Sequence, residues 1–145
     1  MDTERRTTLI RGAVAILAVV VFYAVFFIVW TAVLSNIYLT YSSLLRGERP
    51  WVDLALWAVL PYLVSSFLMV VIAALTFGRD RLRSRPGWLV VLTPPVLVLL
   101  VDLVVGVTRG DPWYVLIRFA AVAAGAGAAF WLVRPRERGH ADLLD

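Results

Sequence analysis

The sequence predicts an all-α membrane protein, a four-helix transmembrane bundle that forms a single domain over residues 1–145. Four apolar runs of 20 to 24 residues support this prediction, and they cover 12–34, 54–77, 88–107 and 113–133. Each run is long enough to cross the hydrocarbon core of a bilayer, roughly 30 Å thick, as a helix. Hydrophobic residues make up 61% of the chain and the mean hydropathy is +0.85. A soluble domain of this size could not bury that much apolar surface.

The arginines divide unevenly between the two sides of the membrane. All fourteen basic residues are arginine, and the net charge is +4. If the four runs alternate in direction, ten arginines fall on one side of the membrane. Basic residues favour the cytoplasmic side, so we expect an up-down-up-down bundle with both termini in the cytoplasm. The ten are Arg5, Arg6, Arg11, Arg79, Arg81, Arg83, Arg85, Arg134, Arg136 and Arg138.

The first run is expected to stay in the mature protein. Arginines precede it, as in a signal peptide, but its 23 residues exceed the apolar core of a signal sequence, which holds about 7–15. Residues 31–36 offer no convincing small-x-small cleavage site. We therefore expect a multi-pass protein of the cell membrane. The exclusive use of arginine is typical of a GC-rich genome and favours a bacterial or archaeal plasma membrane.

The connections between the runs differ in length. In the longest, 35–53, Tyr38, Tyr41, Leu44 and Leu45 recur at near-helical spacing. This pattern predicts either an extension of the first helix or an interfacial half-helix. The other two connections are short, so each makes its flanking helices antiparallel neighbours.

Two ionisable residues lie inside the runs, Asp102 in the third and Arg118 in the fourth. Asp102 precedes the end of its run by five residues and Arg118 follows the start of its run by five. Both should therefore lie roughly 7 Å below the same membrane edge. Because a tight turn joins the two runs, we predict an Asp102–Arg118 ion pair. The pair is either a structural clamp or part of a transport or proton-relay path; a third interpretation has Arg118 snorkelling outward without a partner.

A second polar level is expected near the middle of the bilayer. Tyr23 lies at the centre of the first run, and Ser65 and Ser66 lie at the centre of the second. Pro61 lacks the N–H that would bond to the carbonyl of residue 57. The pattern predicts either a tyrosine–serine hydrogen bond beside a proline kink or a binding pocket between helices.

Two consecutive prolines, Pro94 and Pro95, interrupt the third run and are expected to bend its helix. Broken helices line the sites of many transporters. Kinks are also common in purely structural membrane helices, so both interpretations stay open.

The fourth run is rich in small residues. Ala121, Gly125 and Ala129 share a helical face with Arg118, and their four-residue spacing lets a neighbouring helix approach closely. Residues 120–129 are small on nearly every face, which favours a second close neighbour, either another copy of the chain or a different subunit. The alternative is the general abundance of small residues in membrane helices.

The loop between the second and third runs concentrates positive charge. Its predicted role is contact with anionic lipid headgroups. A docking surface for a cytoplasmic protein is the alternative. The arginines concerned are Arg79, Arg81, Arg83 and Arg85.

Several classes of chemistry are excluded or disfavoured. The chain has no cysteine, which excludes disulfides, thiol redox chemistry and thiolate metal sites. Its one histidine, His140, lies outside the runs, so neither a metal nor another cofactor is expected. Ser65 and Ser66 have no histidine or lysine base inside the runs, which disfavours a serine protease. The arginines flank apolar segments, which favours topology signals over nucleic-acid binding.

We therefore expect no enzymatic activity. The missing catalytic groups, short loops and small-residue fourth run favour a non-catalytic subunit or assembly factor that packs against a larger membrane complex or itself. The alternative is an oligomeric small transporter or channel that uses Asp102 and Arg118. A membrane-permeabilising or toxin-immunity protein is a third hypothesis.

Overall fold

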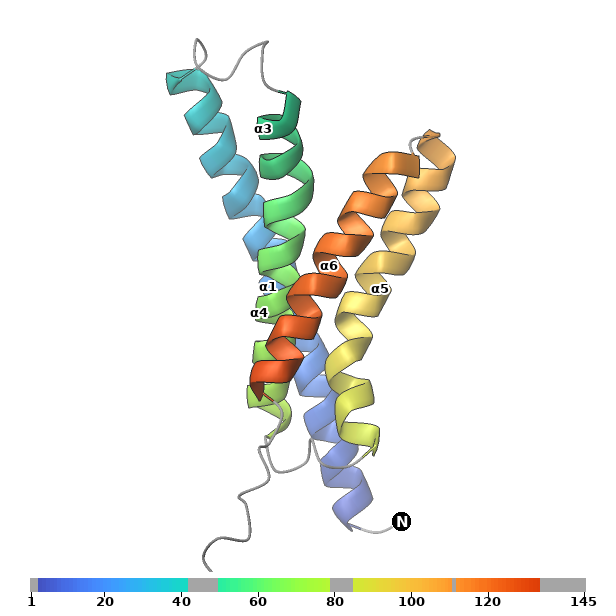
Figure 1. Cartoon of the computed structure of the whole chain (residues 1–145). Coiled ribbons are helices and arrows are strands. Elements are labelled where there is room, and N and C mark those ends of the chain that lie inside the picture. The colour runs from blue at the N-terminus through green and yellow to red at the C-terminus, as the bar shows by residue number, and fades with distance from the viewer. Residues whose placement is uncertain (1–2, 42–49, 79–84, 111, 134–145) are drawn as a thin grey trace, which may run out of the picture.

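The computed structural model describes residues 3–41, 50–78, 85–110 and 112–133, and the secondary structure in these ranges is entirely helical. The short α3, the π-helix η1 and α4 follow one another without a gap and form one long helix (Figure 1). The elements are α1 (Thr3–Thr40), α3 (Pro50–Leu54), η1 (Ala55–Val59), α4 (Leu60–Phe77), α5 (Arg85–Arg109) and α6 (Pro112–Val133).

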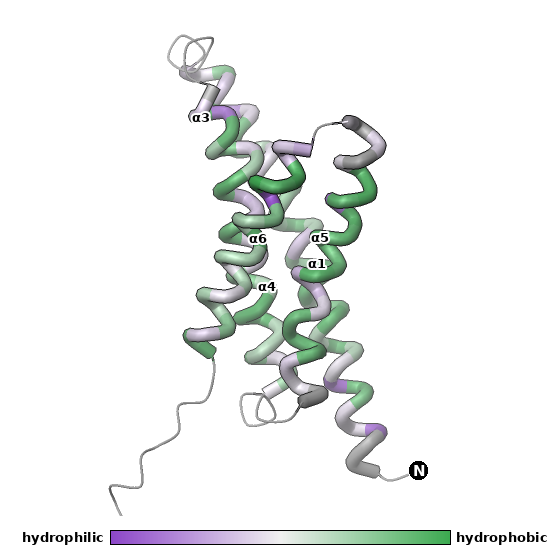
Figure 2. Tube along the Cα trace, turned by 45° about the vertical axis from the view of Figure 1, so that its right-hand side comes forward, coloured by the Kyte–Doolittle hydropathy of each residue, from purple (hydrophilic) through white to green (hydrophobic). Residues whose placement is uncertain are grey.

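Four helical segments of the described residues are long and apolar enough to cross a membrane. Apolar residues dominate all four along most of their length (Figure 2). The prediction of an all-helical, multi-pass membrane protein is thus confirmed at this level. The segments are Arg6–Thr40, Trp51–Phe77, Gly87–Gly106 and Pro112–Val133.

The first helix is much longer than the 12–34 expected from its apolar run. Helix α1 holds 38 residues, or about 57 Å at the rise of an α-helix. Between Ser35 and Thr40 it continues as a direct extension, one of the two arrangements that the tyrosine spacing allowed. The apolar pattern underestimated α1 because polar residues at a membrane surface do not end a helix unless a glycine or proline breaks it. Leu44 and Leu45 lie outside the described residues.

Helix α4 is the centre of the bundle. Half of the most apolar stretch of the Trp51–Phe77 segment is buried, compared with 28% of the corresponding stretch in α6 and 17% in α1 and in α5. It contacts all three other membrane helices, and its contact with α6 is the most extensive. The main buried cluster accordingly lies along α4 and takes Val19 from α1, Val91 from α5 and Ala126 from α6. What α4 contacts therefore decides which side chains meet inside the protein.

Helices α4 and α6 cross in close contact at Gly125. A Cβ atom at this position would collide with the carbonyl oxygen of Leu63 and the hydroxyl of Ser66. Ala121 and Ala129, one turn away on either side, are buried along the same face. The small-residue stripe of α6 is thus the surface that lets its backbone approach α4.

Helix α5 passes through Pro94 and Pro95 without a break. Both prolines are buried, and their fixed φ is compatible with helical geometry although each removes one backbone donor. The structure thus shows no unwound segment at these prolines, and the expected bend of the helix stays a prediction.

Substitution of Gly125 tests the α4–α6 contact. We expect Gly125→Ala to lower the free energy of unfolding by about 1–3 kcal/mol, because the new methyl group must push α6 off α4. Unfolding in mixed micelles at increasing denaturing detergent measures it.

Gly127 on the same helix is the matched control, because a Cβ there meets nothing within 4 Å. Gly127→Ala should leave stability within about 1 kcal/mol of the original. Equal effects of the two substitutions would contradict the close contact.

Candidate functional site

The candidate site begins with the ion pair between α5 and α6. Arg118 Nη1 lies 3.2 Å from Asp102 Oδ1, so the two charges expected at one membrane depth lie together. The tight turn between the helices holds them: Gly110 has a φ of +72° and its N–H bonds to the carbonyl of Gly106. Pro112 then starts α6, where its missing N–H costs nothing.

Tyr62 of α4 is the third member of the site, and the sequence analysis missed it. Its hydroxyl donates to Asp102 Oδ1 at 3.3 Å, and its ring lies 4.8 Å from Arg118 Cζ. The residue is only 8% exposed. A buried tyrosine normally finds a partner for its hydroxyl. Since Tyr62 follows Leu54 by eight residues, it lies roughly 12 Å below the membrane edge and leans back toward that edge. The depth of Tyr62, close to that of Asp102, was the signal in the sequence that could have identified it.

Helix α1 contributes Tyr23 to the same place. Tyr23 reaches this group through aromatic contacts. Its ring packs on Phe27, which in turn contacts the Tyr62 ring edge-on. Each membrane helix in the described part of the chain thus supplies one member of what we call the polar cluster: Tyr23, Tyr62, Asp102 and Arg118.

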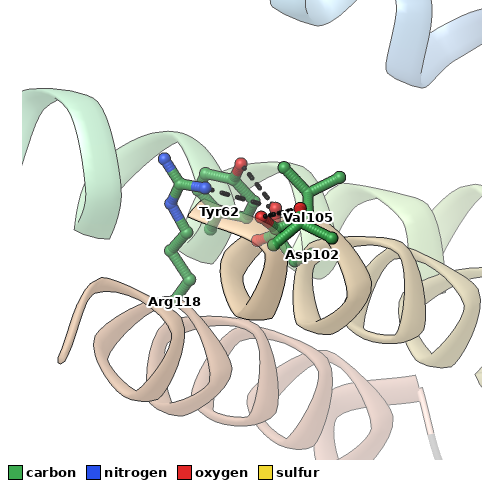
Figure 3. A network of polar contacts seen from close by, with 5 residues as sticks. Tyr62, Asp102, Val105 and Arg118 are labelled. Carbon is green, nitrogen blue, oxygen red and sulfur yellow. Dashed lines mark hydrogen bonds and ion pairs between the residues drawn. The ribbon is translucent and has the colours of Figure 1, made fainter. Parts of the chain in front are cut away.

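The polar cluster is incompletely bonded. Asp102 Oδ1 accepts from both Tyr62 and Arg118 (Figure 3), whereas Asp102 Oδ2 and Arg118 Nε are buried and have no hydrogen-bond partner. The pair is therefore held by one nitrogen and one oxygen instead of the stronger two-bond geometry. Buried polar atoms without partners are uncommon in proteins and cost stability. The polar cluster is therefore the candidate functional site.

The two serines do not join the polar cluster. Ser65 Oγ donates to the carbonyl of Tyr62 at 3.4 Å and Ser66 Oγ to that of Leu63 at 3.0 Å, both within α4. The expected tyrosine–serine hydrogen bond is therefore not what satisfies their protons. A serine in a membrane helix can donate its hydroxyl proton to a backbone carbonyl of the same helix, and both serines do so here.

The backbone beside Pro61 receives a bond from another helix. In η1 the Leu60 N–H bonds to the carbonyl of Ala55, five residues back. The same spacing one residue later ends at Leu56, and Pro61 has no N–H to donate to it. The indole N–H of Trp30 supplies a bond to Leu56 at 3.1 Å. A side chain of α1 thus donates a hydrogen bond to a backbone carbonyl of the neighbouring helix.

A further polar contact ties the extension of α1 to α3. The hydroxyl of Tyr38 donates to the carboxylate of Asp53, and its ring lies 6.1 Å from that of Trp57. Through this contact the C-terminal turns of α1, beyond its apolar run, pack against α3 and η1.

The predicted lipid-binding arginines are not described by the structure. Arg79, Arg81 and Arg83 lie outside the described residues, and Arg85 is the first residue of α5, with its side chain undescribed. Within the described ranges, no group of three histidine, aspartate or glutamate residues could hold a metal ion. The chemistry on view is that of one carboxylate, one guanidinium and two phenols, which suits holding charge or binding a polar group.

No protein-family model, no curated protein and no solved structure matches this chain.

Exchange of the two charges tests the ion pair. Asp102→Asn leaves Arg118 without its anion and should cost roughly 1–3 kcal/mol of unfolding free energy, less than in a fully buried pair because Arg118 is 27% exposed. Asp102→Arg combined with Arg118→Asp should recover at least part of that loss.

Detergent-induced unfolding of the three proteins provides the comparison. A double exchange that is no more stable than Asp102→Asn would remove the ion pair as a stabilising contact.

Proposed function

We propose that this protein is a non-catalytic subunit or assembly factor of a bacterial or archaeal plasma membrane, and that it packs through α6 against another membrane helix. One observation carries the proposal: α6 has small residues on the face that points away from α4. These exposed residues are Ala120, Ala123, Ala124, Gly127 and Ala128.

The packed face of α6 indicates what such a surface does. Around Gly125 the small stripe brings two backbones into contact. The exposed face has the same composition, and a Cβ at Gly127 would meet nothing within 4 Å. By contrast, the exposed faces of α1 and α5 carry large apolar residues such as Ile28 and Val101, which suit lipid. Small residues favour helix association over lipid contact, so the exposed α6 face fits a protein neighbour, either another copy or a different subunit.

The proposal includes an up-down-up-down arrangement with both chain ends in the cytoplasm. Two observations support it. In Figure 1 the end of α1, the start of α3 and the close of the α5–α6 hairpin lie at the top of the molecule. Ten of the fourteen arginines come before the first apolar run, between the second and third runs, or after the fourth run in the sequence, which is the pattern expected of segments on the cytoplasmic side.

Cysteine cross-linking tests the docking face, because the natural chain has no cysteine. We expect Ala124→Cys, on the exposed small face, to form a disulfide or bis-maleimide adduct with a cysteine-bearing chain in native membranes. The mass of the adduct then distinguishes a second copy from a different subunit.

Val101→Cys on the exposed face of α5 is the matched control, since this residue is also exposed but lies among large apolar side chains. Cross-linking of Ala124→Cys that is no more efficient than that of Val101→Cys would count against the proposal. So would purification of the protein from mild detergent as a lone monomer.

A second candidate function, an oligomeric transporter or channel, is supported by the polar cluster. Side chains of α4, α5 and α6 bond to one another there, and two buried polar atoms of the polar cluster lack partners. Ionisable groups inside a membrane often mark ion or proton pathways.

Proton flux separates this candidate from a subunit role. In liposomes loaded with a pH-sensitive dye, the transporter hypothesis predicts a protein-dependent flux that Asp102→Asn abolishes, because a neutral amide cannot bind and release the proton. Asp53→Asn, which changes the acid bonded to Tyr38, should leave the flux intact. A leak indistinguishable from that of protein-free liposomes would argue against transport of protons.

A further inference from the structure

Arg118 uses only part of its guanidinium on Asp102. One terminal nitrogen, Nη1, contacts the carboxylate, while the rest of the group points away from Asp102 (Figure 3). Nε is buried, yet the side chain as a whole is 27% exposed, against 15% for Asp102. The exposed part of Arg118 therefore includes donor capacity that the ion pair does not consume.

The guanidinium is directed toward the Pro112 end of α6. Tyr114 precedes Arg118 by one helical turn, and its ring lies 5.8 Å from Arg118 Cζ. This contact agrees with the general lean of helical side chains toward the N-terminus of their helix. Arg118 follows Pro112 by six residues, a distance of roughly 9 Å along the axis, so its side chain reaches back toward the membrane surface.

The surroundings of this group combine aromatic and apolar surface. Tyr62 and Tyr114 flank the guanidinium, and both rings suit the boundary between hydrocarbon and headgroups. Phe119, the residue that follows Arg118 on α6, is exposed. A ligand with an oxyanion and long apolar chains would match the cation and this apolar surface together.

We propose that Arg118, flanked by Tyr62 and Tyr114, is a binding site for the phosphate group of a phospholipid in the leaflet that faces the Pro112 end of α6. Asp102 and Tyr62 act as positioning residues. Asp102 Oδ1 accepts hydrogen bonds from Arg118 Nη1 and from the Tyr62 hydroxyl. These bonds hold the guanidinium in place, so that its remaining N–H groups can donate to the phosphate. Arginine is well suited to this contact because its donors fan out in one plane.

Charge balance favours a lipid over free phosphate. Asp102 already neutralises Arg118, which weakens attraction for an anion arriving from bulk water. A phospholipid is delivered by its acyl chains and so is present at a high effective concentration. The inference is independent of the subunit role proposed above, because it concerns a different face of α6 from the exposed alanines.

Native mass spectrometry of the delipidated, detergent-solubilised protein tests the site. Dioleoyl-phosphatidylglycerol is titrated against digalactosyl-diacylglycerol, which has acyl chains but no phosphate, and against inorganic phosphate. We expect the first bound phosphatidylglycerol to bind roughly tenfold more tightly than the galactolipid, the size of one charge-assisted contact. Arg118→Gln should abolish this preference.

Arg11→Gln is the charge-matched control, since Arg11 is an exposed arginine near the opposite end of the molecule. It should retain the preference. Equal losses in both variants, or unchanged binding in Arg118→Gln, would overturn the site. Binding of inorganic phosphate as tight as that of phosphatidylglycerol would overturn its assignment to lipid.

Tyr114→Leu guards against a folding defect, because it removes a flanking ring and leaves the Asp102–Arg118 contact in place. Its expected effect is a two- to fivefold weaker phosphatidylglycerol preference with an unchanged circular dichroism spectrum. A folded Tyr114→Leu protein with the full preference, together with an Arg118→Lys protein that also keeps it, would show that the flanked guanidinium is not the binding group.

Discussion

The contact between α4 and α6 organises the rest of the molecule. Gly125 lets the two backbones meet at Leu63, and the direction of α6 along α4 then follows from its small stripe. One turn earlier on that face, Ala121 and Val122 pack with Tyr62 in a second buried cluster. The next residue on the same face is Arg118, which lies over the Tyr62 ring. A packing contact between small residues thus determines where the one charged side chain of α6 is placed. The tight turn holds α5 beside α6, so Asp102 of α5 lies next to Arg118.

The polar cluster shows how a bilayer changes the value of ordinary contacts. Water is absent at this depth, so each polar atom needs a partner within the protein or at the edge of the lipid. Backbone needs are met across helices, as when the Trp30 indole bonds to the carbonyl that Pro61 leaves open. The side-chain needs of the cluster are met only in part. A protein evolved solely for stability could replace such a pair with apolar residues at little cost. The presence of the pair therefore favours a role in binding or in partner specificity.

The sequence predicted contacts between consecutive helices better than contacts between distant ones. Asp102 and Arg118 were paired correctly because a short turn and equal depth leave the two side chains little choice. Tyr62 was missed because its partner lies 40 residues away, and no local pattern reveals that α4 faces the α5–α6 hairpin. The small stripe predicted a close helix contact but not which helix would make it. Tyr23 and the serines were placed at one depth, yet depth alone could not decide between a bond across helices and a bond within one. At its C-terminal end α1 extends to a contact between Tyr38 and Asp53, and a hydropathy pattern cannot predict such a contact.

The wide turn of η1 has a consequence for the geometry of the whole second helix. An ordinary helix advances about 100° per residue, and a π-turn accommodates one additional residue. Side chains before η1 are therefore rotated, relative to those after it, by about a quarter to a third of a circle. In an uninterrupted α-helix Asp53 and Tyr62, nine residues apart, would point about 180° apart, and the additional residue reduces this to about 80°. Asp53 bonds to Tyr38 of α1, and the Tyr62 ring contacts Phe27 of α1 while its hydroxyl bonds to Asp102 of α5. Loss of a single residue from 55–59 would swing the α3 end out of alignment with α1 and leave the α4 end where it is. One irregular turn thus keeps both ends of the long second helix in contact with α1.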